Sequence, residues 1–156
     1  MLGKNYDSEV CSAARALEIV GERWTLLIVR NALFAGSTRF RDFQSKLGLA
    51  TNVLSTRLDT LVDAGLMTKD ADEYRLSDSG RDLVPTLLAL TEWGDRWRAP
   101  RGRPIVYRHA ECGGEVTLTM QCSHEHQVTN PALVLATPGP AMPEARAAGM
   151  LHAVHN

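Results

Sequence analysis

The feature that most constrains the fold is a change of hydrophobic period within residues 47–77. In the stretch LGLATNVLSTRLDTLVDAGLM, residues 47–67, apolar side chains from Leu54 to Val62 keep helical spacing, and Gly65 stands where the helix should end. The segments LMTK and YRLS follow, separated by DADE, and are typical of two short strands of a hairpin. A helix that leads directly into a two-stranded hairpin predicts a small α+β fold.

Helical periodicity also fills the chain before this stretch. Apolar residues from Val10 to Val20 recur at the spacing of an amphipathic helix. After Gly21, the segment RWTLLIVRNALF is apolar almost all round and predicts a buried central helix. The segment GSTRF interrupts it, and helical spacing resumes at Phe40 and continues to Gly48. A helix and a short turn therefore precede the stretch described above.

A long helix is predicted after the hairpin. Ser77 suits its N-cap, and the helical pattern runs to about Trp97, with Pro85 expected to kink the helix or to disturb its first turns. The helix carries more apolar surface than one small core needs, at Leu83, Val84, Leu87, Leu88, Leu90, Trp93 and Trp97. This excess indicates a partner helix, most simply the same helix of a second copy.

The overall charge gives no sign of a nucleic-acid or membrane partner. The 156 residues include 17 basic and 18 acidic side chains, for a net charge of −1. No apolar run approaches the roughly 18 residues of a membrane span, and the N-terminal MLGKNYDSEV lacks the apolar core of a signal peptide. The 3 cysteines fit a reducing compartment better than a disulfide framework. We therefore expect a cytoplasmic protein.

The order helix, short turn, helix and hairpin is that of a winged helix-turn-helix, whose second helix enters the major groove of DNA. The helix expected at residues 50–64 begins with short hydrogen-bonding side chains that suit base edges, namely Thr51, Asn52, Ser55 and Thr56. Basic residues around it are candidates for phosphate contacts: Arg39, Arg41, Lys46, Arg57, Lys69 and Arg75. The alternative is a solvated helix in a winged fold that binds only protein, because residues 21–80 hold eight basic and eight acidic side chains.

From Cys11 to about Trp97 the chain resembles the HxlR family of winged helix-turn-helix transcriptional regulators, a branch of the MarR-like regulators. The resemblance rests on C…ALEIVGERWTLLIVRNALF, then G…RFRDFQSKLGLATNVLSTRLDTLVDAGLM, then YRLSDSGRDLVPTLLALTEWGDRW, in this order. It implies a homodimer, joined through the first and last helices, that binds a pseudo-palindromic site in double-stranded DNA as a repressor or an activator. On the matching positions it places Asn52, Ser55, Thr56 and Arg57 on the recognition helix and Arg75 on the wing.

Two features depart from the family pattern. Asp59 stands where many members carry a basic residue, and the wing KDADEYRL is shorter than usual and acidic at its tip. Asp70, Asp72 and Glu73 repel phosphates, which argues against entry of the wing into the minor groove. These acidic residues support the runner-up function, a dimeric protein-interaction adaptor without specific DNA binding. No residue pattern selects a small-molecule effector.

Cys11 stands at the start of the first helix, where some relatives carry a thiol that senses oxidants or electrophiles. The helix dipole, with Lys4 and Arg15 nearby in sequence, favours a reactive thiol at this place. The alternative is a small apolar residue packed at the dimer interface, because free cysteine is commonly buried. If Cys11 is a sensor, Cys11→Ser should abolish any release of DNA by diamide or a quinone.

The composition changes after RAPRGRP. We expect a winged helix-turn-helix domain at residues 1–98, a small ribbon-like appendage with short strands at 99–130, and a flexible tail at 131–156 that includes the Pro/Ala/Gly-rich segment 137–149. Arginines concentrate where the appendage begins, at Arg96, Arg98, Arg101, Arg103 and Arg108. They are interpreted either as an arm that follows DNA phosphates or as a solvated linker.

The appendage carries residues that bind zinc in other proteins. His109 and Cys112 have the spacing of a ligand pair, and Cys122 with His124 or His126 offers a second pair. Similar tails in relatives use Cys-x2-Cys as the second pair, whereas Glu125 stands at the place of the second cysteine here. The candidate ligands of a structural zinc are therefore His109, Cys112, Cys122 and His126. A hairpin with surface histidines is the alternative.

The sequence predicts no enzyme. The segments GSTRF and ECGGE lack the flanking residues of a phosphate-binding loop, and no nucleophile elbow is present. The one enzymatic interpretation is a hydrolytic zinc in the appendage with Glu111, Glu115 or Glu125 as the base. It is disfavoured because a catalytic zinc needs three sound ligands on a rigid scaffold, which a segment of hairpin size hardly provides.

Overall fold

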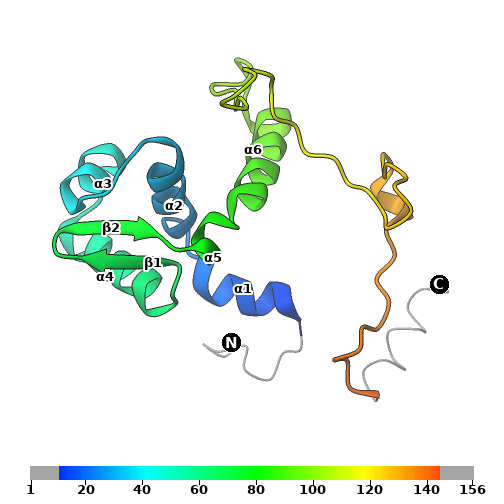
Figure 1. Ribbon diagram of the computed structural model, residues 1–156, viewed down its shortest axis with the longest axis horizontal. Helices are drawn as coiled ribbons and strands as arrows, with labels where there is room; N and C mark the ends of the chain where they lie inside the picture. Colours follow the sequence, from blue (N-terminus) through cyan, green and yellow to red (C-terminus); the bar gives the residue numbers. More distant parts are fainter. Residues whose placement is uncertain (1–10, 145–156) are drawn as a thin grey trace. The chain divides into compact units, whose positions relative to one another are not determined.

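The computed structural model describes residues 11–144, which form two compact units that divide between Val116 and Thr117. The first unit contains six α-helices and one hairpin in its described part, and the second contains a short 3-10 helix, η1 (Pro131–Leu133). The elements of the first unit are labelled in Figure 1: α1 (Ser12–Val20), α2 (Thr25–Phe34), α3 (Phe40–Leu47), α4 (Thr51–Asp63), β1 (Met67–Asp70), β2 (Glu73–Leu76), α5 (Asp78–Arg81) and α6 (Val84–Arg98).

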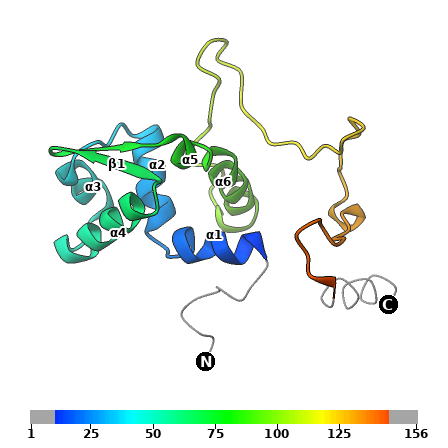
Figure 2. The same cartoon turned by 60° about the horizontal axis from the view of Figure 1, so that its bottom comes forward.

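Helix α2 is the central helix of the first unit, as its apolar sequence predicts. It contacts α1, α3, α4 and α6, and Figure 2 shows α3 and α4 on one side of it and α1 and α6 on the other. Ile28 and Val29 are completely buried. The amphipathic helix expected from Val10 is confirmed as α1, although Val10 itself lies outside the described residues.

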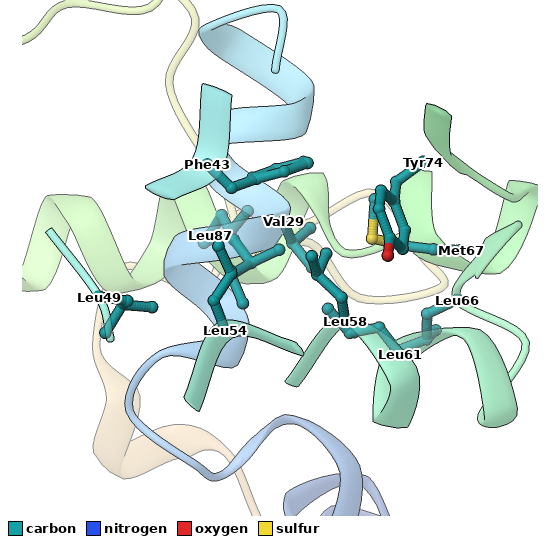
Figure 3. Close-up of a cluster of buried hydrophobic side chains, with 11 residues drawn as sticks. Val29, Phe43, Leu49, Leu54, Leu58, Leu61, Leu66, Met67, Tyr74 and Leu87 are labelled. Carbon is teal, nitrogen blue, oxygen red and sulfur yellow. The ribbon is translucent and has the colours of Figure 1, made fainter. Parts of the chain in front are cut away.

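The core gathers the apolar stripe of α4 against α2, α3 and the hairpin (Figure 3). Leu54, Leu58 and Leu61 are completely buried, as is Phe43 of α3. Tyr74 of β2 packs its ring edge against Phe43, with ring centroids 6.4 Å apart. Burial of a side chain of this size contributes roughly 1.5–3 kcal/mol relative to its exposure. The leucine stripe therefore fixes which face of α4 is turned outward.

Helix α4 ends at a glycine, as the sequence predicts. Gly65 follows the C-cap residue Ala64 and has a φ of 71°, a left-handed conformation that a residue with a Cβ rarely adopts. The amide of Leu66 donates to the carbonyl of Leu61, and that of Gly65 to the carbonyl of Val62, each at 2.9 Å. These two bonds are those of a Schellman motif, and they turn the chain directly into β1.

The predicted hairpin is confirmed, with each strand displaced by one residue from its expected position. Its register pairs Met67 with Leu76 and Asp70 with Glu73, so Ala71 and Asp72 form the turn. Ala71 has a φ of 49°, where glycine or asparagine is usual. The Tyr74 amide donates to the carbonyl of Thr38, which ties β2 to the turn before α3.

The prediction of one long final helix is wrong. The chain forms the four-residue helix α5 and then, after Asp82 and Leu83, the separate helix α6. The Ser77 side chain caps α5 by accepting from the Gly80 amide at 3.2 Å. Pro85 lies in the first turn of α6, where an amide would have no partner within the helix. Pro85 therefore lies at the start of a new helix. The disturbance expected at Pro85 is a complete break between α5 and α6.

The short strands expected across residues 105–130 are not formed. This segment has only the isolated bridges Arg108 to Glu115, in the first unit, and Gln121 to Gln127, in the second. The Tyr107 ring packs on Phe34 of α2, with ring centroids 4.7 Å apart. Of the tail predicted to be flexible, residues 145–156 lie outside the described part of the chain. No helix among the described residues is long and apolar enough to cross a membrane.

Candidate nucleic-acid interface

The turn between α3 and α4 sets the direction of α4. Gly48 ends α3 with a φ of 64°, and Leu49 turns its side chain into the core, with 7% of its surface exposed. The Gln44 side chain donates to the Thr51 hydroxyl at 2.9 Å, which joins α3 to the first residue of α4. The two helices and this short turn form the helix-turn-helix that the sequence predicts.

The first turns of α4 present a polar surface. Thr51, Asn52 and Thr56 are exposed, and Ser55 is half-buried. The Thr56 hydroxyl donates to the Asn52 carbonyl at 2.9 Å, and Ser55 lies 3.4 Å from a carboxylate oxygen of Asp59. No residue of the described chain hydrogen-bonds to the Asn52 side-chain amide, so its donors and acceptor remain available. An amide of this kind can pair with an adenine edge in the major groove.

Three of the arginines predicted to contact phosphates pair with acidic residues of the protein. Arg39 lies 3.6 Å from Glu73, and Arg75 pairs with the same carboxylate. Arg57 Nε lies 3.2 Å from Glu22 Oε2, without the alignment of a hydrogen bond. Both side chains of that pair are 32% exposed. The Arg57 side chain thus extends from α4 and packs against the segment before α2.

The other residues predicted to contact phosphates, Arg41, Lys46 and Lys69, form no ion pair with an acidic side chain of the described residues. Arg41 is exposed on α3, and Lys46 donates from Nζ to the carbonyl of Ala35. On the wing, the Lys69 ammonium lies 5.2 Å from the centre of the Tyr74 ring. A hydrogen bond to the Tyr74 side chain is the main cause that raises the pKa of Lys69 above its ordinary value. Arg41 thus stands without an acidic partner in the described structure, and Lys69 stays charged.

Sequence reasoning missed the hydrogen bonds and ion pairs through which acidic residues organise this surface. Asp42 accepts from the amides of Arg39, at 2.9 Å, and Thr38, at 3.3 Å, and these bonds lower the pKa of its carboxyl group. An acidic residue in the first turn of a predicted helix is the signal that could have identified Asp42. Glu22 carries no such signal, because its partner Arg57 is distant in sequence. Nothing in the local sequence of Glu73 indicates that it pairs with Arg39.

The structure brings only some of the candidate zinc ligands together, and it shows the candidate sensor Cys11 at the surface. Cys11 is exposed at the N-cap of α1. His109 Nδ1 lies 3.3 Å from Cys112 Sγ in the first unit, and the Cys122 amide donates to the His126 carbonyl in the second. Among residues 11–144, no three His, Cys, Asp or Glu side chains form a group that could hold a metal ion. The zinc site and the thiol sensor stay predictions.

The arginine run that begins in the last turn of α6 forms several contacts within the first unit. Arg103 pairs with Glu115, which lowers the pKa of that carboxyl group. Arg108 donates to the carbonyl of Gly113 at 3.0 Å. The Arg98 guanidinium lies 5.9 Å from the centre of the Trp93 ring. An arm that follows DNA phosphates stays a prediction for this segment.

Comparison with known proteins places the chain among helix-turn-helix regulators. An uncharacterized HTH-type transcriptional regulator of Mycobacterium tuberculosis is 41% identical over 137 residues, covering 83% of this chain and 86% of the relative. YvaP of Bacillus subtilis, of the same description, is 35% identical over 60% of this chain and 94% of its own length.

Two solved structures share the fold. PA1607, a candidate transcription factor, superposes with a TM-score of 0.72 at 35% identity and covers 82% of this chain and 95% of its own. PA1374 of Pseudomonas aeruginosa, also a candidate transcription factor, gives a TM-score of 0.63 at 32% identity, over 89% of this chain and 99% of its own. The sequence profile of the HxlR-like helix-turn-helix family matches residues 19–102. The protein belongs to the HxlR-like helix-turn-helix family.

Proposed function

We propose that the protein is a homodimeric transcriptional regulator that inserts α4 of each copy into the major groove of a pseudo-palindromic operator. The observation that carries this proposal is the polar face of α4. Its leucines are buried while Thr51, Asn52 and Thr56 face outward from the start of the helix. In a helix-turn-helix, the N-terminal residues of the second helix are those that reach base edges.

Exposed apolar residues of α1 and α6 support the homodimer. Leu17 of α1 is 57% exposed, and Leu90, Trp93 and Trp97 of α6 are 53%, 54% and 63% exposed. Leu17 and Leu90 also border a hollow of about 370 Å³ between these helices and α2. Large apolar side chains grouped in this way favour burial against another protein surface. A second copy would cover them and present two recognition helices to two half-sites.

The acidic partners of the arginines set the expected strength of DNA binding. Phosphates must compete with Glu73 for Arg39 and Arg75, and with Glu22 for Arg57. We therefore expect modest non-specific affinity that falls steeply with salt, with the sequence preference supplied by α4. This balance is consistent with the net charge of −1.

The proposal is tested by fluorescence anisotropy of the full chain on DNA from upstream of its own gene, against a scrambled duplex, at two salt concentrations. We expect salt-sensitive binding that prefers the upstream duplex, a preference that Asn52→Ala weakens. Asn130→Ala, the same substitution in the second unit, serves as the control and should leave binding unchanged. Equal weak binding to both duplexes, together with a genomic DNA selection that recovers no sequence, would contradict the proposal and favour the protein-interaction adaptor.

A further inference from the structure

A second hollow, of about 330 Å³, lies on the first unit between α2, the turn before α3, β2 and α5. Figure 2 shows these elements side by side, and β2 contacts both α2 and α5. Leu33, Leu76 and Tyr74 supply apolar surface to its lining, and Ser37, Arg75 and Arg81 supply polar groups. A mostly apolar hollow of this size with a few convergent polar groups is typical of a small-molecule site.

Ser37 is the feature of this hollow that packing does not explain. The residue is 1% exposed, yet its hydroxyl has no hydrogen-bond partner. Its amide donates to the Asn31 carbonyl at 3.1 Å, so the backbone holds the residue in place independently of the side chain. A buried hydroxyl without a partner destabilises a protein. A ligand that hydrogen-bonds to this hydroxyl would remove that penalty.

The charges around the hollow determine the kind of ligand. Arg75 and Arg81 both line it, whereas no Asp or Glu of the described chain does. Arg75 is already paired with Glu73, so Arg81 is the cation available to a ligand. The Arg81 guanidinium donates from Nη1 to the Leu76 carbonyl at 2.6 Å, which fixes it at the rim. Its Nη2 lies 4.0 Å from the exposed Asp78 carboxylate, too far for a hydrogen bond, so a ligand carboxylate can compete for it. A planar guanidinium held in this way is suited to a carboxylate, which can accept two parallel hydrogen bonds.

We propose that this hollow binds a small aromatic carboxylate. The carboxylate pairs with Arg81 and accepts from the Ser37 hydroxyl, and the ring packs on Leu33 and Leu76. This inference concerns the protein without DNA and does not depend on the proposed operator binding. The hollow connects the turn before α3 with the wing strand β2, the two segments joined by the Tyr74 to Thr38 hydrogen bond.

The test is a titration of the ¹⁵N-labelled full chain with phenylacetate, followed by NMR. We expect saturable shifts of the amides of Ser37 and Leu76. Phenylacetamide, which lacks the charge, and inorganic phosphate, which lacks the ring, should each bind at least about tenfold more weakly. Absence of saturable shifts with phenylacetate at millimolar concentrations would overturn the proposal. Phosphate binding as tight as that of phenylacetate would overturn it as well.

Ser37→Ala separates a ligand-binding hydroxyl from a structural one. We expect the variant to bind phenylacetate about tenfold more weakly and to keep or raise its thermal unfolding midpoint, because the removed hydroxyl has no partner in the free protein. Ser123→Ala, in the second unit, is the matched control and should match the parent in both measurements. A Ser37→Ala variant with a lowered midpoint and undiminished binding would show that the hydroxyl serves the fold instead.

Discussion

At the scale of single residues, arginines that look equivalent in the sequence differ in what they contact. Arg57 lies within α4 beside the polar face, but its guanidinium is turned to Glu22 and only a third of the side chain is exposed. Arg41, on α3, is exposed. The Arg57 side chain therefore connects α4 to the segment before α2, whereas the exposed Arg41 is the better candidate for the proposed phosphate contact.

Alanine substitutions distinguish these two roles. Arg57→Ala should lower the free energy of unfolding by about 1 kcal/mol, because it removes a partly buried ion pair and the packing of the side-chain stem. Arg41→Ala should leave the unfolding free energy within about 0.5 kcal/mol of the parent and reduce the slope of log affinity against log salt by about 1. Denaturant unfolding and DNA titrations at several salt concentrations measure the two effects. Equal effects of both variants on stability would contradict this assignment.

The outward residues of α4 could be predicted from the sequence, whereas the ion pairs could not. Helical spacing alone places Asn52 and Thr56 opposite the stripe formed by Leu54 and Leu58. The partner of Arg57 depends on how α2 packs against α4, which no local pattern encodes. Ser37 likewise reads as an ordinary turn residue in the sequence. Only the folded structure shows that its hydroxyl is buried.

At the scale of elements, the start of α3 depends on one carboxylate. Asp42 accepts from the amides of Arg39 and Thr38, which otherwise have no partner at the helix N-terminus. Because its pKa is lowered from 3.8, the ionised carboxylate stabilises the folded state fully above that value. The stabilisation is lost as the pH falls through the lowered pKa.

Asp42→Ala should therefore lower the thermal unfolding midpoint at neutral pH, and the difference from the parent should shrink as the pH falls below 3.8. Asp72→Ala, an exposed aspartate in the hairpin turn, is the control and should change the midpoint little. Midpoints measured by circular dichroism across the acid range test this. A difference that stays constant down to the acid limit would show that the charge of Asp42 does not contribute.

Most elements could be predicted, and the exceptions have physical causes. Periodicity and the glycines at positions 48 and 65 define α3, α4 and the hairpin to within about a residue. Pro85 predicts a disturbance of the final helix but not its division into α5 and α6, which arises because Ser77 caps a single turn and Pro85 suits the start of a new helix. The strands expected across residues 105–130 were wrong because their polar and small residues form isolated bridges instead of a continuous ladder.

At the scale of the whole molecule, the proposed binding to two half-sites requires two copies of the chain. We expect sedimentation at about twice the mass of the 17.1 kDa chain. Trp97→Glu, which places a charge on the exposed apolar face of α6, should shift the protein to monomer and weaken operator binding. Leu133→Glu changes a comparably exposed residue, 74% accessible in the second unit, and should remain dimeric. A monomeric parent would contradict the account at this scale.

The central claim is that α4 contacts base edges through Asn52. The measurement that tests it most directly compares the parent and Asn52→Ala on an operator recovered by selection and on its single base-pair variants, as a double-mutant cycle. The account predicts one base-pair position in each half-site where substitution costs the parent about tenfold or more in affinity and costs Asn52→Ala almost nothing. If Asn52→Ala instead loses the same factor on every duplex, Asn52 does not contact a base, and the claim is wrong.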